Sequence, residues 1–187
     1  MNLISNATHE TRVAPKVWKL FLMTAMFVFL FQPIAAEACC EYNSPLYSYR
    51  TKSYGDSYIY AYLNSNLRYG DGWFNPYSFD FVKGYSSTAW MGDSPYNAAE
   101  VQFSHEFYFS GVGASISAGS GGVGANLSID GNTATFSDKC SNCWERSFSH
   151  DEIKPSGMLV YRSETVIGRF RFGSSWFSIS GYDSDYM

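Results

Sequence analysis

A strict two-residue alternation of apolar and polar side chains most constrains how this chain can fold. It is clearest over residues 100–110, where one set of alternate positions is apolar except for a single histidine: Val101, Phe103, His105, Phe107 and Phe109. Successive side chains of a strand point to opposite faces of a sheet. The segment is therefore predicted to be a strand with one face in the protein core.

Similar alternation recurs along the chain, whereas the spacing of an amphipathic helix is scarce. The other predicted strands are Leu46–Arg50, Tyr58–Leu63, Tyr77–Val82, Thr133–Phe136, Met158–Arg162, Val166–Phe172 and Ser175–Ser180. Turn-forming Gly, Asn, Asp and Ser residues separate them. About ten short strands at this spacing predict an all-β, single-domain antiparallel β-sandwich, with a partly closed barrel as the alternative.

The N-terminal segment has the composition of an export signal. Basic residues precede a twelve-residue apolar run, Leu20–Phe31, and small residues follow at Ala36 and Ala38. A signal peptide spanning 1–38 and cleaved after Ala38 is expected, which leaves a β-sandwich domain at 39–187. The protein is thus predicted to be secreted or extracytoplasmic.

The same run is too short to hold the protein in a membrane. Twelve helical residues rise about 18 Å, against the roughly 30 Å of a hydrocarbon core. Pro33 would break any extension of the helix. Lipidation of Cys39 is an open alternative, although Glu37 stands where a lipoprotein signal carries a small residue.

Charge excludes one class of partner. Residues 1–38 hold three of the 13 basic and two of the 17 acidic side chains, so the processed chain has 10 basic against 15 acidic residues. No basic stripe is left to neutralise phosphates, and nucleic acid is not expected as a partner.

The four cysteines form two close pairs, Cys39-Cys40 and Cys140/Cys143. An even number of cysteines in an exported chain favours disulfides. Two cross-links between the pairs are preferred, because a bond between adjacent residues falls outside ordinary Cα–Cα distances. Local pairing of Cys140 with Cys143 is the alternative. Redox and zinc chemistry are disfavoured, since no βαβ unit is visible and one pair is vicinal.

No catalytic, metal or cofactor site is predicted. His105 is expected to be a hydrogen-bonded core residue, and His150 a solvated loop residue. No Gly-x-Ser-x-Gly elbow is present. Acids on predicted strands, such as Glu100, Glu106 and Asp80, keep a small secreted hydrolase open as a less favoured hypothesis.

Aromatic residues are the candidate ligand contacts. Trp73, Trp90 and Trp176 lie near predicted turns, and Tyr58, Tyr60 and Tyr62 share a strand face. Such rings can stack on sugars, and they can equally belong to a core or an interface. The leading hypothesis is therefore a non-enzymatic extracellular binding module for a glycan or a protein.

A segment of small residues supports an alternative. Residues 111–130 alternate Gly and Ser with Val, Ala, Ile and Leu around Gly119–Gly122, which predicts a long hairpin. This pattern resembles the amphipathic hairpin that β-pore-forming toxins insert into membranes. A membrane partner is expected only under this membrane-active alternative.

Overall fold

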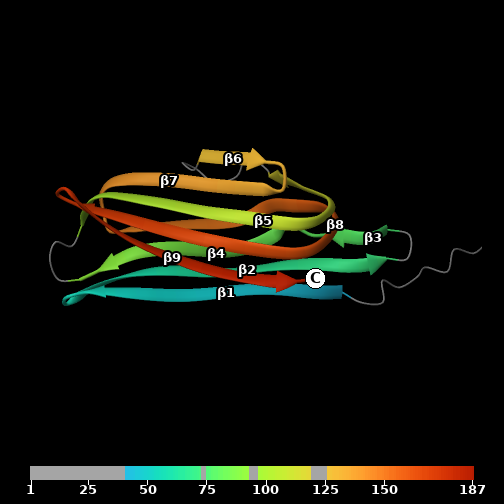
Figure 1. The fold of residues 1–187 in the computed structure, drawn as a ribbon, viewed down its shortest axis with the longest axis horizontal. Coiled ribbons are helices and arrows are strands. Elements are labelled where there is room, and N and C mark those ends of the chain that lie inside the picture. Colours follow the sequence, from blue (N-terminus) through green and yellow to red (C-terminus); the bar gives the residue numbers. More distant parts are fainter. Residues whose placement is uncertain (1–40, 73–74, 93–96, 119–125) are drawn as a thin grey trace, which may run out of the picture. The chain divides into compact units, whose positions relative to one another are not determined.

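The structure is a computed structural model that describes residues 41–187 apart from 73–74, 93–96 and 119–125. Within this part the chain forms nine strands and no helix (Figure 1). In chain order they are β1 (Glu41–Tyr54), β2 (Ser57–Gly72), β3 (Asn75–Phe79), β4 (Val82–Met91), β5 (Ala98–Ala118), β6 (Asn126–Asp130), β7 (Thr133–Cys143), β8 (Glu145–Phe172) and β9 (Ser175–Tyr186).

All nine strands belong to one antiparallel sheet, in the order β1-β2-β4-β8-β5-β7-β6, with β3 beside β2 and β9 beside β8. The predicted all-β antiparallel class is confirmed. Division into two separate sheets and a count of ten strands remain predictions. One difference arises because Met158–Arg162 and Val166–Phe172, expected as two strands, are parts of the single 28-residue strand β8.

Strand β8 changes partner along its length. From Glu145 to Ile153 it pairs with β4, and from Ile153 to Arg171 it pairs with β5. The second half also takes β9 on its other edge. The sheet consequently folds back on itself into two halves. One half contains β1, β2 and β4, the other contains β5, β7 and the second part of β8, and the two halves share one interior. A Cβ added at Gly168 on β8 would overlap the Thr88 hydroxyl on β4, which shows how closely the halves approach.

The interior follows from the alternation read in the sequence. In β5, the side chains of the predicted core face are at most 3% exposed: Val101, Phe103, His105, Phe107 and Phe109. They pack with apolar residues of the other half, including Leu46, Ile59, Leu63 and Ile153. Burial of this apolar surface is the main favourable contribution to folding.

Two strands with a free edge, β1 at one end of the sheet order and β9 beside β8, lie near each other (Figure 1). The backbone N–H of Tyr47 donates to the Asp183 carboxylate at 2.8 Å. The Arg162 guanidinium donates to the backbone carbonyl of Ser44 at 2.9 Å. No backbone ladder joins β1 to β9 in the described part of the chain, so side chains bridge this seam.

In the described parts of the predicted 111–130 hairpin, the two arms do not pair with each other. Residues 111–118 instead continue strand β5 along β8, while β6 pairs with β7. The Asp130-Gly131-Asn132 turn, whose Gly131 has φ of 58°, connects β6 tightly to β7. The expected hairpin tip, Gly119–Gly122, lies outside the described residues.

The preferred cross-links between the cysteine pairs are also wrong. Cys140 is bonded to Cys143, with a Cα–Cα distance of 6.2 Å, which is within the ordinary disulfide range. Asn142, at φ 54°, turns the chain back between them. Asparagine tolerates this left-handed conformation better than most residues. Cys39 and Cys40, with the predicted signal peptide at 1–38, lie outside the described residues.

Candidate functional site

A cluster of fully buried polar side chains occupies the interior between the two halves of the sheet. Ser86 comes from β4, His105 from β5, and Arg162 and Glu164 from β8, and each is 0% exposed. Arg162 and Glu164 are two positions apart and therefore point to the same face of β8. Buried charged groups need partners, because an unpaired charge in an apolar interior is very costly.

Each charge in this buried cluster is paired. Oε1 of Glu164 accepts from Nη2 of Arg162 at 2.6 Å and from the Ser65 hydroxyl at 2.8 Å. Oε2 of Glu164 lies 3.0 Å from Nε2 of His105, which donates because a carboxylate only accepts. Nδ1 of His105 lies 2.9 Å from Oγ of Ser86. The prediction that His105 is a hydrogen-bonded core residue is confirmed.

Electrostatics keep the buried carboxyl group ionised. Burial alone would raise the pKa of Glu164, but the positive charge of Arg162 and the hydrogen bond from His105 outweigh it and lower the pKa to about 2. Burial lowers the pKa of Arg162, and Glu164 opposes that shift. The pair is an internal salt bridge that ties β8 to β2 and, through Ser44, to β1.

His150 is not the solvated loop residue that was predicted. It lies in β8, is 5% exposed, and neither ring nitrogen has a hydrogen-bond partner in the described part of the chain. Its ring packs 5.1 Å from that of His105 and 4.8 Å from that of Phe107. Burial, and then the neighbouring His105, lower its pKa to about 3. His150 is therefore neutral at pH 7 and borders a cavity of about 50 Å³.

Ser86, His105 and Glu164 have the connectivity of a hydrolytic triad, with hydroxyl, imidazole and carboxylate in sequence. A nucleophile must also reach a substrate carbonyl. Ser86 is completely shielded from solvent, so the arrangement as it stands links strands and is closed to substrate. Of the strand acids, Glu100 forms an ion pair with Arg171 at 3.1 Å on the outer surface.

The outer surface of the β1-β2-β4 half carries a connected group of tyrosines, which we call the tyrosine face: Tyr47, Tyr49, Tyr60, Tyr62 and Tyr85. Ring centroids lie 5.8 Å apart for Tyr47–Tyr62, 5.9 Å for Tyr49–Tyr60 and 6.1 Å for Tyr62–Tyr85. Tyr47 is 60% and Tyr49 is 50% exposed. Aromatic rings thus form a continuous surface across three strands that is open to solvent.

The tryptophans that were predicted as ligand contacts do not form one site. Trp90 is 5% exposed and packs against Tyr54, Phe172 and Phe177, so it belongs to the core and offers little surface to a ligand. Trp176 is 41% exposed on β9, with the guanidinium of Arg169 5.2 Å from its ring. Trp73 lies outside the described residues.

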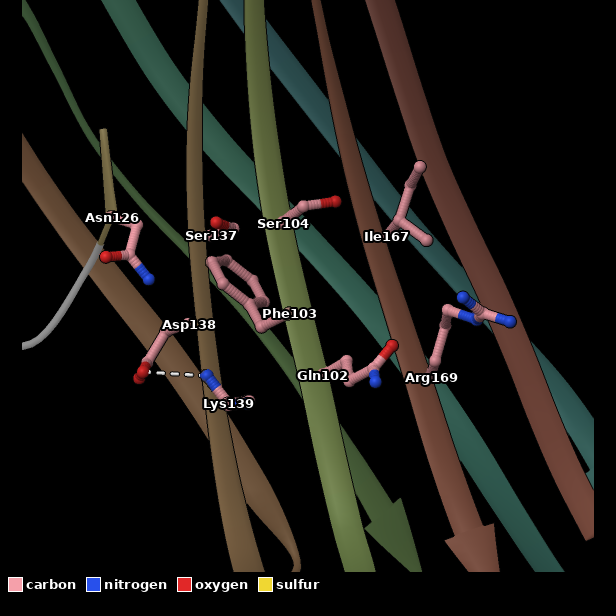
Figure 2. Close-up of a pocket in the computed structure, with 9 residues that line it drawn as sticks. All are labelled: Gln102, Phe103, Ser104, Asn126, Ser137, Asp138, Lys139, Ile167 and Arg169. Atoms are coloured by element: carbon pink, nitrogen blue, oxygen red, sulfur yellow. Dashed lines mark hydrogen bonds between the residues drawn. The ribbon is translucent and has the colours of Figure 1, made fainter. Parts of the chain in front are cut away.

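A groove of about 460 Å³ crosses the outer surface of the β8-β5-β7 half, and we call it the polar groove (Figure 2). Its lining residues are Gln102, Phe103, Ser104, Asn126, Ser137, Asp138, Lys139, Ile167 and Arg169. Figure 2 shows Gln102 and Arg169 on neighbouring strands and Asn126 on the opposite side. Arg169, which lines the groove, also contacts the exposed ring of Trp176.

Part of the tyrosine face could be predicted from the sequence. Tyr60 and Tyr62 were recognised as sharing a face, and Tyr58, also on that face, is 37% exposed. Tyr47 and Tyr49 alternate in the same way within a predicted strand, which was the available signal. Tyr85 could be added only from the β2–β4 register. This register places Tyr85 opposite Asn64, which is the next residue after Tyr62 on the same face of β2.

Comparison with protein-family models and with characterised proteins gives no relative from which to infer a function. No protein-family model matches the chain, and no characterised protein matches it significantly. In the part that the structure describes, no cluster of three or more His, Cys, Asp or Glu side chains is placed to hold a metal ion. None of the described segments is a helix of the length and hydropathy needed to span a bilayer.

Proposed function

We propose that this protein is a non-enzymatic extracellular binding module that takes a saccharide on its tyrosine face. The observation that carries the proposal is the continuous ring surface of Tyr47, Tyr49, Tyr60, Tyr62 and Tyr85 across three strands. Soluble proteins rarely expose large contiguous apolar patches, and those that are exposed commonly mark binding sites.

The chemistry of the face suits a sugar. A pyranose ring has C–H groups that pack on an aromatic face, and a tyrosine hydroxyl can exchange hydrogen bonds with sugar hydroxyls. The surrounding outward positions include the hydroxyls and amide of Asn64, Ser147 and Ser149, together with the charged Lys83 and Glu145. Asn64 also donates to the Tyr62 hydroxyl at 3.3 Å. A hydroxyl-rich aromatic surface of this kind supports binding of a polysaccharide.

The strands under the face hold the rings in place. Tyr62 lies opposite Tyr49 in the β1–β2 register, and Tyr60 opposite Thr51. Burial is the main cause of a raised pKa of Tyr60, so its phenol, like an ordinary tyrosine, is protonated at neutral pH and can donate. Because the rings are positioned before a ligand arrives, less conformational entropy is lost on binding.

The test is a glycan array probed with the purified protein and with two variants. Tyr49→Ser combined with Tyr62→Ser removes the centre of the face, whereas Tyr186→Ser removes an 81% exposed tyrosine elsewhere. We expect a defined glycan class to bind the parent and the Tyr186 variant, and binding to the double variant to be lost with little change in melting temperature. Equal binding by the double variant, or no binding of the parent to any glycan on the array, would overturn the proposal.

We further propose that the domain works outside the cytoplasm after removal of residues 1–38. The apolar run Leu20–Phe31 supports export, and the Cys140–Cys143 bond suits an oxidising compartment. Mass spectrometry of protein from culture medium should find Cys39 at the N-terminus. Finding residue 1 intact in the medium would contradict this.

We also propose that the two halves of the folded sheet act as the layers of a β-sandwich. The close contacts of Gly168 with Thr88, and of Gly181 with Ser48 and Ala61, support this packing.

A second candidate function, membrane activity, is favoured by one observation. The cross-strand pair Val112 and Met158 is 75% and 45% exposed, and Val160 on the same strand is 50% exposed. Dye release from phosphatidylcholine vesicles that is lost in Val112→Asp would support membrane activity. Intact vesicles at micromolar protein would remove it.

A further inference from the structure

The polar groove contains a cross-strand row of side chains that the tyrosine face does not involve. Lys139 on β7 lies opposite Gln102 on β5, and Gln102 lies opposite Arg169 on β8. Neighbouring strands are about 4.8 Å apart, so the backbones of the two cations are separated by about 10 Å with an amide between them. Both cations are exposed and face the same outer surface.

The acids near this row are already neutralised. Oδ2 of Asp138 lies 3.3 Å from Nε of Arg146, and Oδ1 accepts from the backbone N–H of Lys139 at 2.7 Å, as Figure 2 shows. Arg171 is 3.1 Å from Glu100. Within the described residues, Lys139 and Arg169 have no ion-pair partner. The groove is a locally positive site on a chain whose net charge is −4.

The rest of the lining carries hydroxyl and amide groups. Ser104 and Ser137 form the next cross-strand row, and Asn126 lies opposite Ser137. Arg169 also stacks on Trp176, which offers an aromatic ring beside the cation. Cations and hydroxyls within the groove, with an aromatic ring beside Arg169, match the groups of a sugar acid.

We propose that the polar groove binds an acidic saccharide, with the carboxylate held between Lys139 and Arg169 and the sugar hydroxyls on Ser104, Ser137 and Asn126. A volume of about 460 Å³ accommodates one to a few sugar units. Charge-assisted hydrogen bonds from Arg169 select a carboxylate over a neutral sugar. Glu106, the next outward acid on β5 after Ser104, disfavours a longer polyanion by repulsion.

This site is independent of the tyrosine face, because the two lie on different halves of the sheet and share no residue. The proposal therefore does not rest on the proposed function. Variants of the polar groove can abolish that site and leave the tyrosine face intact, and variants of the tyrosine face can do the reverse.

The test measures binding of trigalacturonate by NMR titration of the full protein. The fully methyl-esterified trimer is the neutral counterpart, and sodium acetate and inorganic phosphate represent simple anions. We expect saturable shifts for the free acid that weaken as salt is added, with little response to the ester, acetate or phosphate. Arg169→Gln and Lys139→Gln should each weaken binding about tenfold or more.

Lys83→Gln is the matched control, because it removes an exposed cation from the other half of the sheet. It should change the affinity less than about twofold. Tyr49→Ser/Tyr62→Ser should also leave trigalacturonate binding unchanged. The proposal is overturned if the ester binds as well as the acid, if phosphate or acetate binds equally, if Arg169→Gln binds normally, or if no saturable binding is seen at millimolar ligand.

Discussion

Oε2 of Glu164 lies 3.0 Å from Nε2 of His105, and both residues are fully buried between the halves of the sheet. The same carboxylate pairs with Arg162, which reaches Ser44 on β1. One acid therefore connects the second half of β8 to β5 and, through Arg162, to the far edge of the sheet. The hydrogen bonds of this contact are directional, whereas the hydrophobic effect that drives the apolar packing around it is not.

Replacing Glu164 should destabilise the fold strongly. Glu164→Gln leaves the buried guanidinium of Arg162 without a counter-charge, and breaking a buried pair in this way costs about 3–5 kcal/mol. Urea unfolding at pH 7 gives the measurement. The control is Glu106→Gln, an exposed acid on β5, which should change stability by less than about 0.5 kcal/mol.

A double variant separates the lost charge pair from lost packing. Arg162→Met combined with Glu164→Leu removes both charges together, and buried pairs replaced this way are often neutral or better in stability. We expect it to be more stable than Glu164→Gln. If Glu164→Gln unfolds at the same urea concentration as the parent, the carboxylate does not hold the interior together.

His150 should make stability fall on mild acidification. Its pKa is about 3 in the folded state and about 6.5 in an unfolded chain. The unfolded state therefore binds the proton first, so stability is complete above pH 6.5 and is lost as the pH falls from 6.5 toward 3. Between pH 7 and pH 5 the loss is about 2 kcal/mol by this linkage.

The comparison is the same pair of pH values in His150→Phe and His150→Leu. Both remove the titrating group, and their stability should change much less over this range. The lowered pKa of Glu164 acts in the same direction, but only below its ordinary value near 4.5. A pH dependence that survives unchanged in both variants would show that His150 is not its source.

The alternation in β5 was sufficient to place His105 correctly, because period two assigns each residue to one face of a strand. His150 was misplaced since its neighbours Asp151, Glu152 and Pro155 read as a polar loop. In the structure Asp151 is exposed and Pro155 buried within the continuous strand β8. The Arg162–Glu164 pair was missed because its two charges need partners from β1, β2 and β5, and those contacts depend on tertiary register.

Residue pairing over long sequence distances was the other limit. The sequence of residues 111–130 fits a hairpin, but in the structure residues 111–118 pair with β8 and residues 126–130 pair with β7. Likewise, local geometry at Asn142 decides that Cys140 bonds to Cys143. The tyrosine face was half visible because alternation shows which tyrosines share a face within a strand, and only strand order brings Tyr85 beside them.

The Cys140–Cys143 bond should contribute modestly to stability. It closes a loop of only four residues, for which the chain-entropy estimate is about 2 kcal/mol. Cys140→Ser/Cys143→Ser should lower the unfolding free energy by about that amount and leave the fold intact by circular dichroism. A loss of about 4–5 kcal/mol, the size expected for a closed loop of about 100 residues, would contradict this estimate.

The contact between Gly168 and Thr88 should make any side chain at position 168 destabilising. The Thr88 hydroxyl donates to the Tyr60 carbonyl at 2.7 Å, so it cannot rotate away without losing that bond. Gly168→Ala would force its Cβ into Thr88, and overpacking of this kind costs about 1–3 kcal/mol. Gly181→Ala is the matched control on β9, where a Cβ would lie 3.1 Å from the Ser48 hydroxyl and cost less.

The measurement is chemical denaturation of both variants and of Gly168→Ala combined with Thr88→Ala. Partial recovery in the double variant would assign the cost to this contact, whereas equal stability of the two single variants would mean that the halves of the sheet are not packed this closely.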